Sequence, residues 1–291
     1  MLCDSGSEAV GAWGVLCLRR QWAIASLFRR WIGRFLSGVR LLPRFGVLST
    51  SISFLMSSSE PFKWKHFQPD VILLNVHWYC RYNLSFRDLE EMMAERGISV
   101  DHSTIHRWVL QYAPQIDQRC RPHLSPTSSS WRVDETFIKV KRGCRYLYRA
   151  VDDQGNTLDF LLAHSRDADA AERFFRKALN ASHTKTPDVI NVDKLAIYPC
   201  AIRRLHKDGT LPANTELRQV KYLNNILEQD HRRIKRLIFI PFGFRTFDSA
   251  QRTLQGYEAI AMIRKGQVKG IPKGDVTGQI SFIHNIFGVA A

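Results

Sequence analysis

The sequence predicts an α/β fold in which a mixed five-stranded sheet with flanking helices follows a small helical unit. Two observations predict this fold class. From residue 131 onward, short runs rich in Val, Tyr, Leu and Ile are interspersed with segments of helical periodicity. Between residues 70 and 114, apolar residues recur only at helical spacing, with capping residues between the segments. Helices are therefore expected first and the sheet second.

The helical unit is expected to contain three helices. The first covers residues 70–82. Ser85 and Asp88 form a capping-box pattern that starts the second helix, which ends at Gly97. Asp101 caps the third helix, and Pro114 is expected to stop it. Residues 115–130, which are rich in turn-forming residues toward their end, are then expected to form a linker.

Two short helices joined by a glycine turn are typical of a helix-turn-helix, whose second helix enters the major groove of DNA. On this interpretation the core side of the third helix carries Ile105, Trp108 and Val109. The side that faces DNA carries His102, Ser103, His106 and Arg107. A plain helical hairpin in a small bundle has the same periodicity and remains the alternative.

The sheet is expected to form from five runs with strand character, at residues 133–140, 145–151, 158–162, 189–193 and 217–223. Turn residues at 152–156 join the second run to the third. Helices are expected at residues 168–179, 198–205 and 224–236. Three strands, a helix, a strand, a helix, a strand and a helix is the order of a ribonuclease H-like core.

Three carboxylates occupy positions in these elements that suit a metal site. Asp134 lies on the first strand, Asp193 ends the fourth, and Glu228 lies on the last helix. Acids from two strands and a helix can converge on two divalent cations, which activate the attacking oxygen and stabilise the leaving one in a phosphoryl displacement. Successive strand residues point to opposite faces, so only one of Asp134 and Glu135 can enter the site, and the alternation does not decide which.

Each of these acids also has an ordinary structural interpretation. Asp193 could be a turn residue at a strand end, and Glu228 could be a solvated partner of Arg232 one helical turn away. It is their order and spacing together that favours a metal site.

The charge of the chain favours a polyanionic partner. The formal net charge is +15, so nucleic acid is the first candidate and an acidic membrane surface the second. Downstream of Glu228, a cationic helical face could hold the DNA backbone in a salt-dependent way, or could simply keep the helix solvated. Its proposed DNA contacts are His231, Arg232, Lys235 and Arg236.

The six cysteines contain no CxxC pair, and no uncharged apolar run reaches 18 residues. Neither a zinc site, a disulfide framework nor a membrane-spanning helix is therefore predicted, and we expect a cytoplasmic protein with no membrane partner.

Residues 1–55 differ from the rest of the chain. They hold seven arginines, no lysine and only two acids, without a sustained periodic pattern. A basic amphipathic helix or an arginine-rich transit peptide would have this composition. We expect instead an extension that is non-native or disordered, with the native start at Met56, because regular patterning begins only after that residue.

Three blocks of the sequence carry a family resemblance: WRVDETFIKVK at 131–141, YLYRAVD at 146–152 and VKYLNNILEQDHR at 220–232. With RDA at 166–168 and MIRKGQ at 262–267, they closely resemble the DDE transposases of bacterial insertion sequence family six. The similarity extends from about residue 62 to residue 267, in several blocks that keep their order.

The resemblance implies that Asp134, Asp193 and Glu228 are the catalytic and metal-binding triad, which selects Asp134 over Glu135. It implies two Mg²⁺ ions as cofactors, with Mn²⁺ able to substitute. The helix-turn-helix would bind the terminal inverted repeats of the element. The enzyme, a homo-oligomer in its active complex, would cleave the element's ends and join the 3′ ends to target DNA. Cointegrates would form by replicative transposition, and the protein would be nucleoid-associated while bound.

The expected organisation is an extension at 1–55, a helix-turn-helix domain at 56–114, a linker at 115–130, a catalytic domain at 131–269 and a tail at 270–291. Two alternative functions stay open. Residues around Asp193 depart from the family pattern, so the chain could be a catalytically impaired helix-turn-helix repressor of transposition. It could also be a general ribonuclease H-like nuclease or integrase that cuts without terminal repeats.

Overall fold

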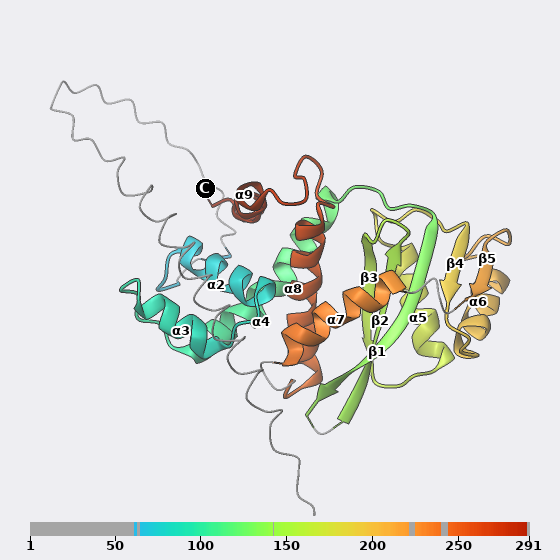
Figure 1. The fold of residues 1–291 in the computed structure, drawn as a ribbon, viewed down its shortest axis with the longest axis horizontal. Helices are drawn as coiled ribbons and strands as arrows, with labels where there is room; N and C mark the ends of the chain where they lie inside the picture. The colour runs from blue at the N-terminus through green and yellow to red at the C-terminus, as the bar shows by residue number, and fades with distance from the viewer. Residues whose placement is uncertain (1–60, 63–64, 142, 221–224, 240–243, 290–291) are drawn as a thin grey trace, which may run out of the picture. The chain divides into compact units, whose positions relative to one another are not determined.

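The computed structural model describes residues 61–289 apart from 63–64, 142, 221–224 and 240–243 (Figure 1). These residues belong to one compact unit, which spans Ser58–Ala291. The predicted extension at 1–55 and the start at Met56 lie outside the described residues. Each helix within the described ranges is too short or too polar to cross a bilayer.

Five strands form one mixed sheet in the order β3-β2-β1-β4-β5. The antiparallel part consists of β1 (Ser130–Val140), β2 (Gly143–Asp152) and β3 (Thr157–Ala163). The parallel part adds β4 (Val189–Val192) beside β1 and β5 (Glu216–Gln219) beside β4. Helix α5 precedes β4 and α6 precedes β5. This order and these directions are the ribonuclease H-like topology, so the predicted fold class is confirmed.

One face of the sheet is covered by α5 (Ala168–Leu179) and α6 (Ile197–Lys207). Asp167 caps α5 by accepting a hydrogen bond from the Ala170 amide at 2.7 Å, as a helix N-cap aspartate should. The apolar stripe of α5 buries Phe174 and Phe175 completely. Burying each phenylalanine contributes about 2 kcal/mol. The predicted helix at 168–179 is confirmed with the predicted bounds.

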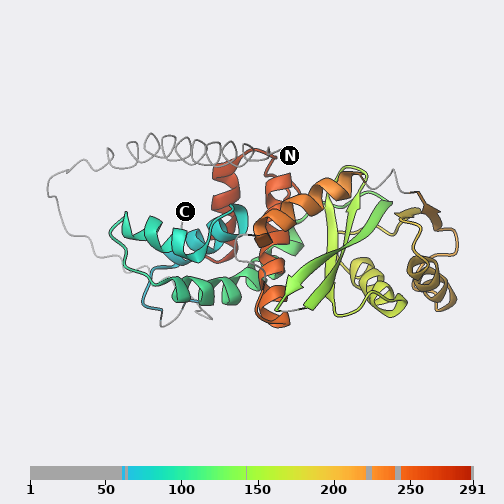
Figure 2. The ribbon, with the colours of Figure 1, turned by 60° about the horizontal axis from the view of Figure 1, so that its bottom comes forward.

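The opposite face is covered by α7 (Asn225–Phe239) and α8 (Phe247–Lys265), as Figures 1 and 2 show. The register explains which strand residues meet these helices. Arg149 of β2 lies opposite Asp134 of β1. Arg149 donates hydrogen bonds to Glu258 of α8 and to Asp230 of α7. Side chains on the same face of the sheet as Arg149 and Asp134 therefore point toward both helices.

The three predicted helices of the N-terminal unit are present as α2 (Pro69–Arg81), α3 (Phe86–Ala94) and α4 (His102–Cys120). Ser85 and Asp88 form both bonds of the capping box, and Asp101 caps α4 through the Ser103 amide. Gly97 has φ +72° at the end of α3, where a side chain would be strained. The predicted helices and turn are confirmed, while their use as a DNA-reading helix-turn-helix stays a prediction.

The expectation that Pro114 stops the third helix is wrong. α4 continues through Pro114 to Cys120, into residues predicted to be linker. Its buried stripe runs on at helical spacing through Tyr112, Ile116 and Cys120. Burial of that stripe outweighs the backbone hydrogen bond that proline cannot donate. The helix thus does not end at residue 114. The division into two domains joined by a linker remains a prediction.

Helix α8 was not predicted, and α4 packs along it. The two helices approach closely at Gly256, where a Cβ atom would lie 2.6 Å from the Ala113 Cβ and 2.7 Å from the Cys80 Sγ. A further unpredicted helix, α9 (Val276–Ile286), lies in the expected tail and contacts α2, α4 and α8. One helix, α8, thus contacts both the helical unit and the sheet.

Candidate metal centre and DNA-facing pocket

Asp134 and Asp193 meet where two parallel strands separate. β1 pairs with β4 only over Ser130–Arg132, whose last partner on β4 is Asn191. Asp134 and Asp193 each lie two residues beyond the last paired residue of their strand. Their carboxylates form a close group with that of Glu135, with ligand atoms within 4.8 Å of one another. Neighbouring strands therefore bring together two of the three acids that the sequence singled out.

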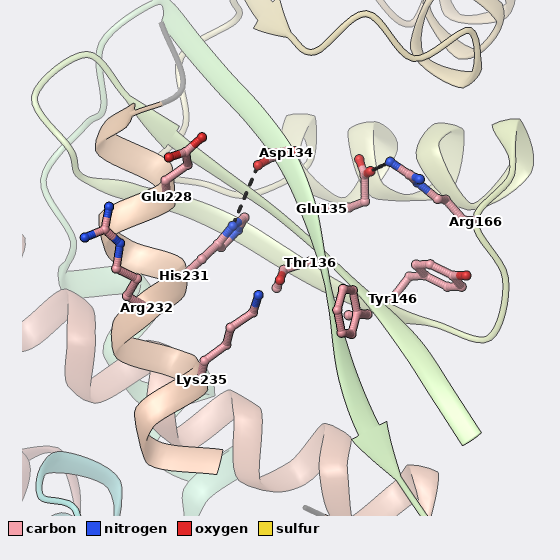
Figure 3. Close-up of a pocket in the computed structure, with 10 residues that line it drawn as sticks. Asp134, Glu135, Thr136, Tyr146, Arg166, Glu228, His231, Arg232 and Lys235 are labelled. Atoms are coloured by element: carbon pink, nitrogen blue, oxygen red, sulfur yellow. Dashed lines mark hydrogen bonds and ion pairs between the residues drawn. The ribbon is translucent and has the colours of Figure 1, made fainter. Parts of the chain in front are cut away.

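Glu228, the third acid, comes from the first turn of α7 and lines the same pocket as Asp134. Among the described residues, Glu228 is not part of the close group of Asp134, Glu135 and Asp193. The pocket is open and has a volume of about 430 Å³. Its chemistry is mixed: acids, cations and two aromatic rings face one space (Figure 3).

Asp134 and Glu135 point to opposite sides of β1, as alternation on a strand requires (Figure 3). Asp134 points toward α7 and its Glu228 and His231. The Glu135 carboxylate accepts hydrogen bonds from Arg166 and from the Tyr198 hydroxyl on the other side. Glu135 thus has two protein partners, while Asp134 faces the third predicted acid.

The electrostatics of Asp134 favour a cation. Burial above all, and then the charges of Glu135, Asp193 and Glu228, raise its pKa to about 7, against a lowering backbone hydrogen bond. Part of this shift comes from the negative charges of three neighbouring carboxylates, which a divalent cation would neutralise. Carboxylate oxygens are also the ligands that Mg²⁺ prefers. The donor set therefore fits a hard divalent metal.

His231 is buried against Asp134 and does not belong to the exposed cationic face that the sequence suggested. Its Nδ1 lies 3.7 Å from the Asp134 Oδ2. Burial, then Arg149 and Lys235, lower the His231 pKa to about 3, so the imidazole is neutral at pH 7. The other three residues of the prediction, Arg232, Lys235 and Arg236, are exposed on α7. Arg232 and Lys235 line the pocket.

The four residues predicted to face DNA from α4 differ in accessibility. Ser103 and Arg107 are exposed. His102 is half-buried, with its Nδ1 3.1 Å from the Glu90 carboxylate. His106 is also half-buried, its ring edge-on to Phe86, and burial followed by the charge of Arg245 lowers its pKa. The core side, Ile105, Trp108 and Val109, is buried as predicted. Contact with DNA remains a prediction for all four.

A buried ionic network behind the pocket was missed by the sequence reasoning. Arg149 is fully buried and donates to the Glu258 carboxylate at 2.6 and 2.8 Å and to Asp230 at 2.8 Å. Lys265 of α8 also donates to Asp230, at 2.7 Å. Asp230 is two residues from Glu228, so the network fixes the turn of α7 that carries the third acid. Helical spacing could have shown that Asp230 and Glu228 share a turn, but it could not identify Arg149 as the partner.

Residues 128–267 match the sequence family described as DDE domain. The chain is 37% identical over 204 residues to a transposase for the insertion sequence-like element IS431mec of Staphylococcus aureus strain Mu50. That alignment covers 70% of this chain and 88% of the relative. The transposase for insertion sequence element IS257 in transposon Tn4003 of Staphylococcus aureus has the same identity and coverage. Among solved structures, the HTLV-2 integrase catalytic core domain in complex with magnesium is similar with a TM-score of 0.36 and 14% identity. It covers 51% of this chain and 94% of that one.

Proposed function

Since this chain belongs to the DDE transposases of bacterial insertion sequence family six, we propose that it cleaves DNA strands at the ends of an insertion sequence and transfers the 3′ ends to target DNA. One observation carries the proposal. Asp134 and Asp193 meet where β1 and β4 separate, and Glu228 of α7 lines the same open pocket as Asp134. An open site suits a polymer such as DNA, which must enter from the side.

Asp134, Asp193 and Glu228 would hold two Mg²⁺ ions, for which Mn²⁺ can substitute. When bound, such ions supply Lewis acidity at the attacking and leaving oxygens of an in-line displacement. The raised pKa of Asp134, which is caused by burial and then by the charges of the neighbouring carboxylates, supports this assignment. Glu135, held by Arg166 and Tyr198, keeps β1 in place beside the triad.

The cations of α7 have a separate role. Arg232 and Lys235 line the pocket beside the acids, and Arg236 is exposed one turn further along. We assign them to the phosphate backbone on either side of the cleaved bond, with His231 supporting Asp134 as a neutral neighbour. Binding through such contacts weakens steeply with salt.

The helix-turn-helix formed by α3 and α4 would bind the terminal inverted repeats, with Ser103 and Arg107 as its exposed contacts and His102 and His106 beside them. Joining both element ends to a target requires two active sites, so we propose a homo-oligomer in the active complex. Transfer of 3′ ends without excision would form cointegrates by replicative transposition. The protein would then work at the bacterial nucleoid.

The test uses purified protein, duplexes ending in the element's terminal repeat, and Mg²⁺. Asp134→Ala should lower strand transfer by at least about 1000-fold, because the metal site loses a ligand, while repeat binding in a gel-shift assay persists. Asp248→Ala, which removes an exposed carboxylate of α8, is the matched control and should transfer normally.

Strand transfer by Asp134→Ala at the wild-type rate would refute the catalytic assignment. Sequence-specific binding with no cleavage by the wild-type protein, in Mg²⁺ or Mn²⁺, would indicate a repressor instead. Cleavage that is indifferent to the repeat would indicate a general nuclease.

A further inference from the structure

Phe137 is an unusual residue for a strand beside a set of acids. It lies on β1 three residues after Asp134 and is 62% exposed. An exposed phenylalanine is common on protein surfaces when it stands alone. Phe137 does not stand alone, because it lines the pocket together with Asp134 and Glu228. An accessible aromatic ring inside a polar site points to an apolar part of the ligand.

The neighbours of Phe137 make a surface suited to a flat ring. Tyr146 lies directly opposite on β2 and also lines the pocket. Lys235 of α7 places its Nζ 5.1 Å from the centre of the Phe137 ring, in cation–π contact. A ring with a cation over one face, and a second ring opposite it on the next strand, form a site for an aromatic group that carries negative charge.

The separation of β1 from β4 makes this surface reachable from the metal site. No described strand pairs with that side of β1 between Val133 and the bridge from Val140 to Phe244. One ligand that passes along this edge can therefore contact Asp134 on one face of β1 and the exposed Phe137 on the other. Asp134 and Phe137 are three residues apart, roughly 10 Å along a strand. Stacked bases rise about 3.4 Å each, so this distance spans about three nucleotides.

We propose that Phe137, with Tyr146 and Lys235 beside it, stacks an unpaired nucleobase of the DNA end, within about three nucleotides of the phosphate that is cleaved. The inference rests on the proposed function, because it requires a DNA strand in this pocket. A base in a duplex has both faces covered by its neighbours, so the base must leave its pair, at a cost that stacking on the ring offsets. Lys235 then lies close enough to contact the adjacent phosphate.

An apolar side chain of a partner protein is the competing occupant. The charges disfavour it, since three acids and two cations line the same pocket as the ring: Asp134, Glu135, Glu228, Arg232 and Lys235. A hydrophobic partner would have to bury these groups without pairing them. A nucleotide pairs with the cations through its phosphate and with the ring through its base.

The experiment combines a protein series with a DNA series. The proteins are wild type, Phe137→Ala, Phe137→Trp and, as a matched control, Phe239→Ala, which removes the 77% exposed ring at the end of α7 outside the pocket. The duplexes carry the terminal repeat with an abasic nucleotide at each of the first three positions in turn. Strand transfer is measured in Mg²⁺. A second readout irradiates complexes with 5-iodouracil at the same positions and maps the crosslinked residue.

Phe137→Ala should lose about 10- to 100-fold in strand transfer, as expected for one base stack. Phe137→Trp and Phe239→Ala should stay near wild type. At one of the three positions, the abasic nucleotide should lower strand transfer by the wild type by a similar factor. At that position it should not lower transfer by Phe137→Ala any further, because both changes remove the same contact. 5-Iodouracil at that position should crosslink to Phe137.

Two results would overturn the inference. One is unchanged strand transfer by Phe137→Ala. The other is an abasic loss that multiplies with the Phe137→Ala loss at all three positions. Absence of transfer by the wild type would overturn the proposed function alone, since the crosslink to Phe137 is formed without catalysis. Absence of that crosslink from a protein that does transfer strands would overturn the stacking and leave the proposed function intact.

Discussion

Replacing Glu258 by glutamine should destabilise the protein by about 3 kcal/mol, and the structure indicates why. Glu258 and Arg149 are both fully buried and share two short hydrogen bonds. Glutamine keeps the shape but removes the charge, and its amide NH₂ meets a donor of Arg149. Breaking a buried ion pair from one side costs about 3–5 kcal/mol. Asp230 still pairs with Arg149 at 2.8 Å, so the lower end of that range applies.

The assay is urea unfolding at pH 7, followed by tryptophan fluorescence and circular dichroism. Asp248→Asn is the control, because the Asp248–Arg252 pair lies on the same helix but is exposed, and its loss should leave the midpoint unchanged. Arg149→Met completes a double-mutant cycle with Glu258→Gln. The double variant should cost at least about 1.5 kcal/mol less than the sum of the single variants, since the two changes remove one interaction.

A loss below about 1 kcal/mol for Glu258→Gln, or simple additivity in the cycle, would refute the reasoning. Either result would mean that the packing of α8 and β2 holds Arg149 in place without help from the charge of Glu258.

Three further predictions concern the helical unit and its contact with α8. Gly256→Ala gains about 1 kcal/mol of helix propensity but forces a Cβ atom into Ala113 and Cys80, at a cost of about 1–3 kcal/mol. Urea unfolding should therefore show a net loss of stability. Combining the change with Cys80→Ala should recover part of that loss. Burial, then Arg81 and His284, lower the pKa of His77 from 6.5 to about 3. As the pH falls from 6.5 toward 3, the imidazole is therefore protonated in the unfolded chain but not in the folded one. The wild type should therefore lose about 2 kcal/mol between pH 7.5 and 5 through His77. His77→Phe should remove that share of the loss in unfolding at both pH values and leave the share of His231, whose pKa is lowered in the same way. Ser85→Ala removes the cap of α3 and should lower stability by about 1 kcal/mol in the same measurement; an unchanged midpoint would mean that the capping box is dispensable.

The order of elements and the two strand acids could be predicted from sequence because both depend on local patterns. Strand runs and turn residues mark β1 to β4, and Asp193 follows directly after such a run. Parallel neighbours then bring Asp134 and Asp193 together without further information. The choice of Asp134 over Glu135 needed the family resemblance, because two adjacent residues on a strand have the same local context.

What could not be predicted depends on contacts between distant segments. Pro114 is a local stop signal, yet α4 continues because its stripe is buried against a helix more than a hundred residues away. α8 is buried on nearly all sides, so it lacks the polar face by which a surface helix is recognised. His231 was grouped with its basic neighbours by sequence, although the rotation of α7 turns it inward to Asp134.

The open edge of β1 has a consequence for handling the protein. Between Val133 and Val140, this side of the strand has no partner strand among the described residues, and an unpaired edge is a template on which another chain can add a strand. Lys139 places an exposed charge along it, and the net charge of +15 makes copies repel one another. Salt shortens the reach of that repulsion from about 10 Å at 0.1 M to about 3 Å at 1 M. On the proposed function, salt added to release the protein from DNA during purification would also weaken its defence against edge-to-edge aggregation, and a short duplex would be the better stabiliser.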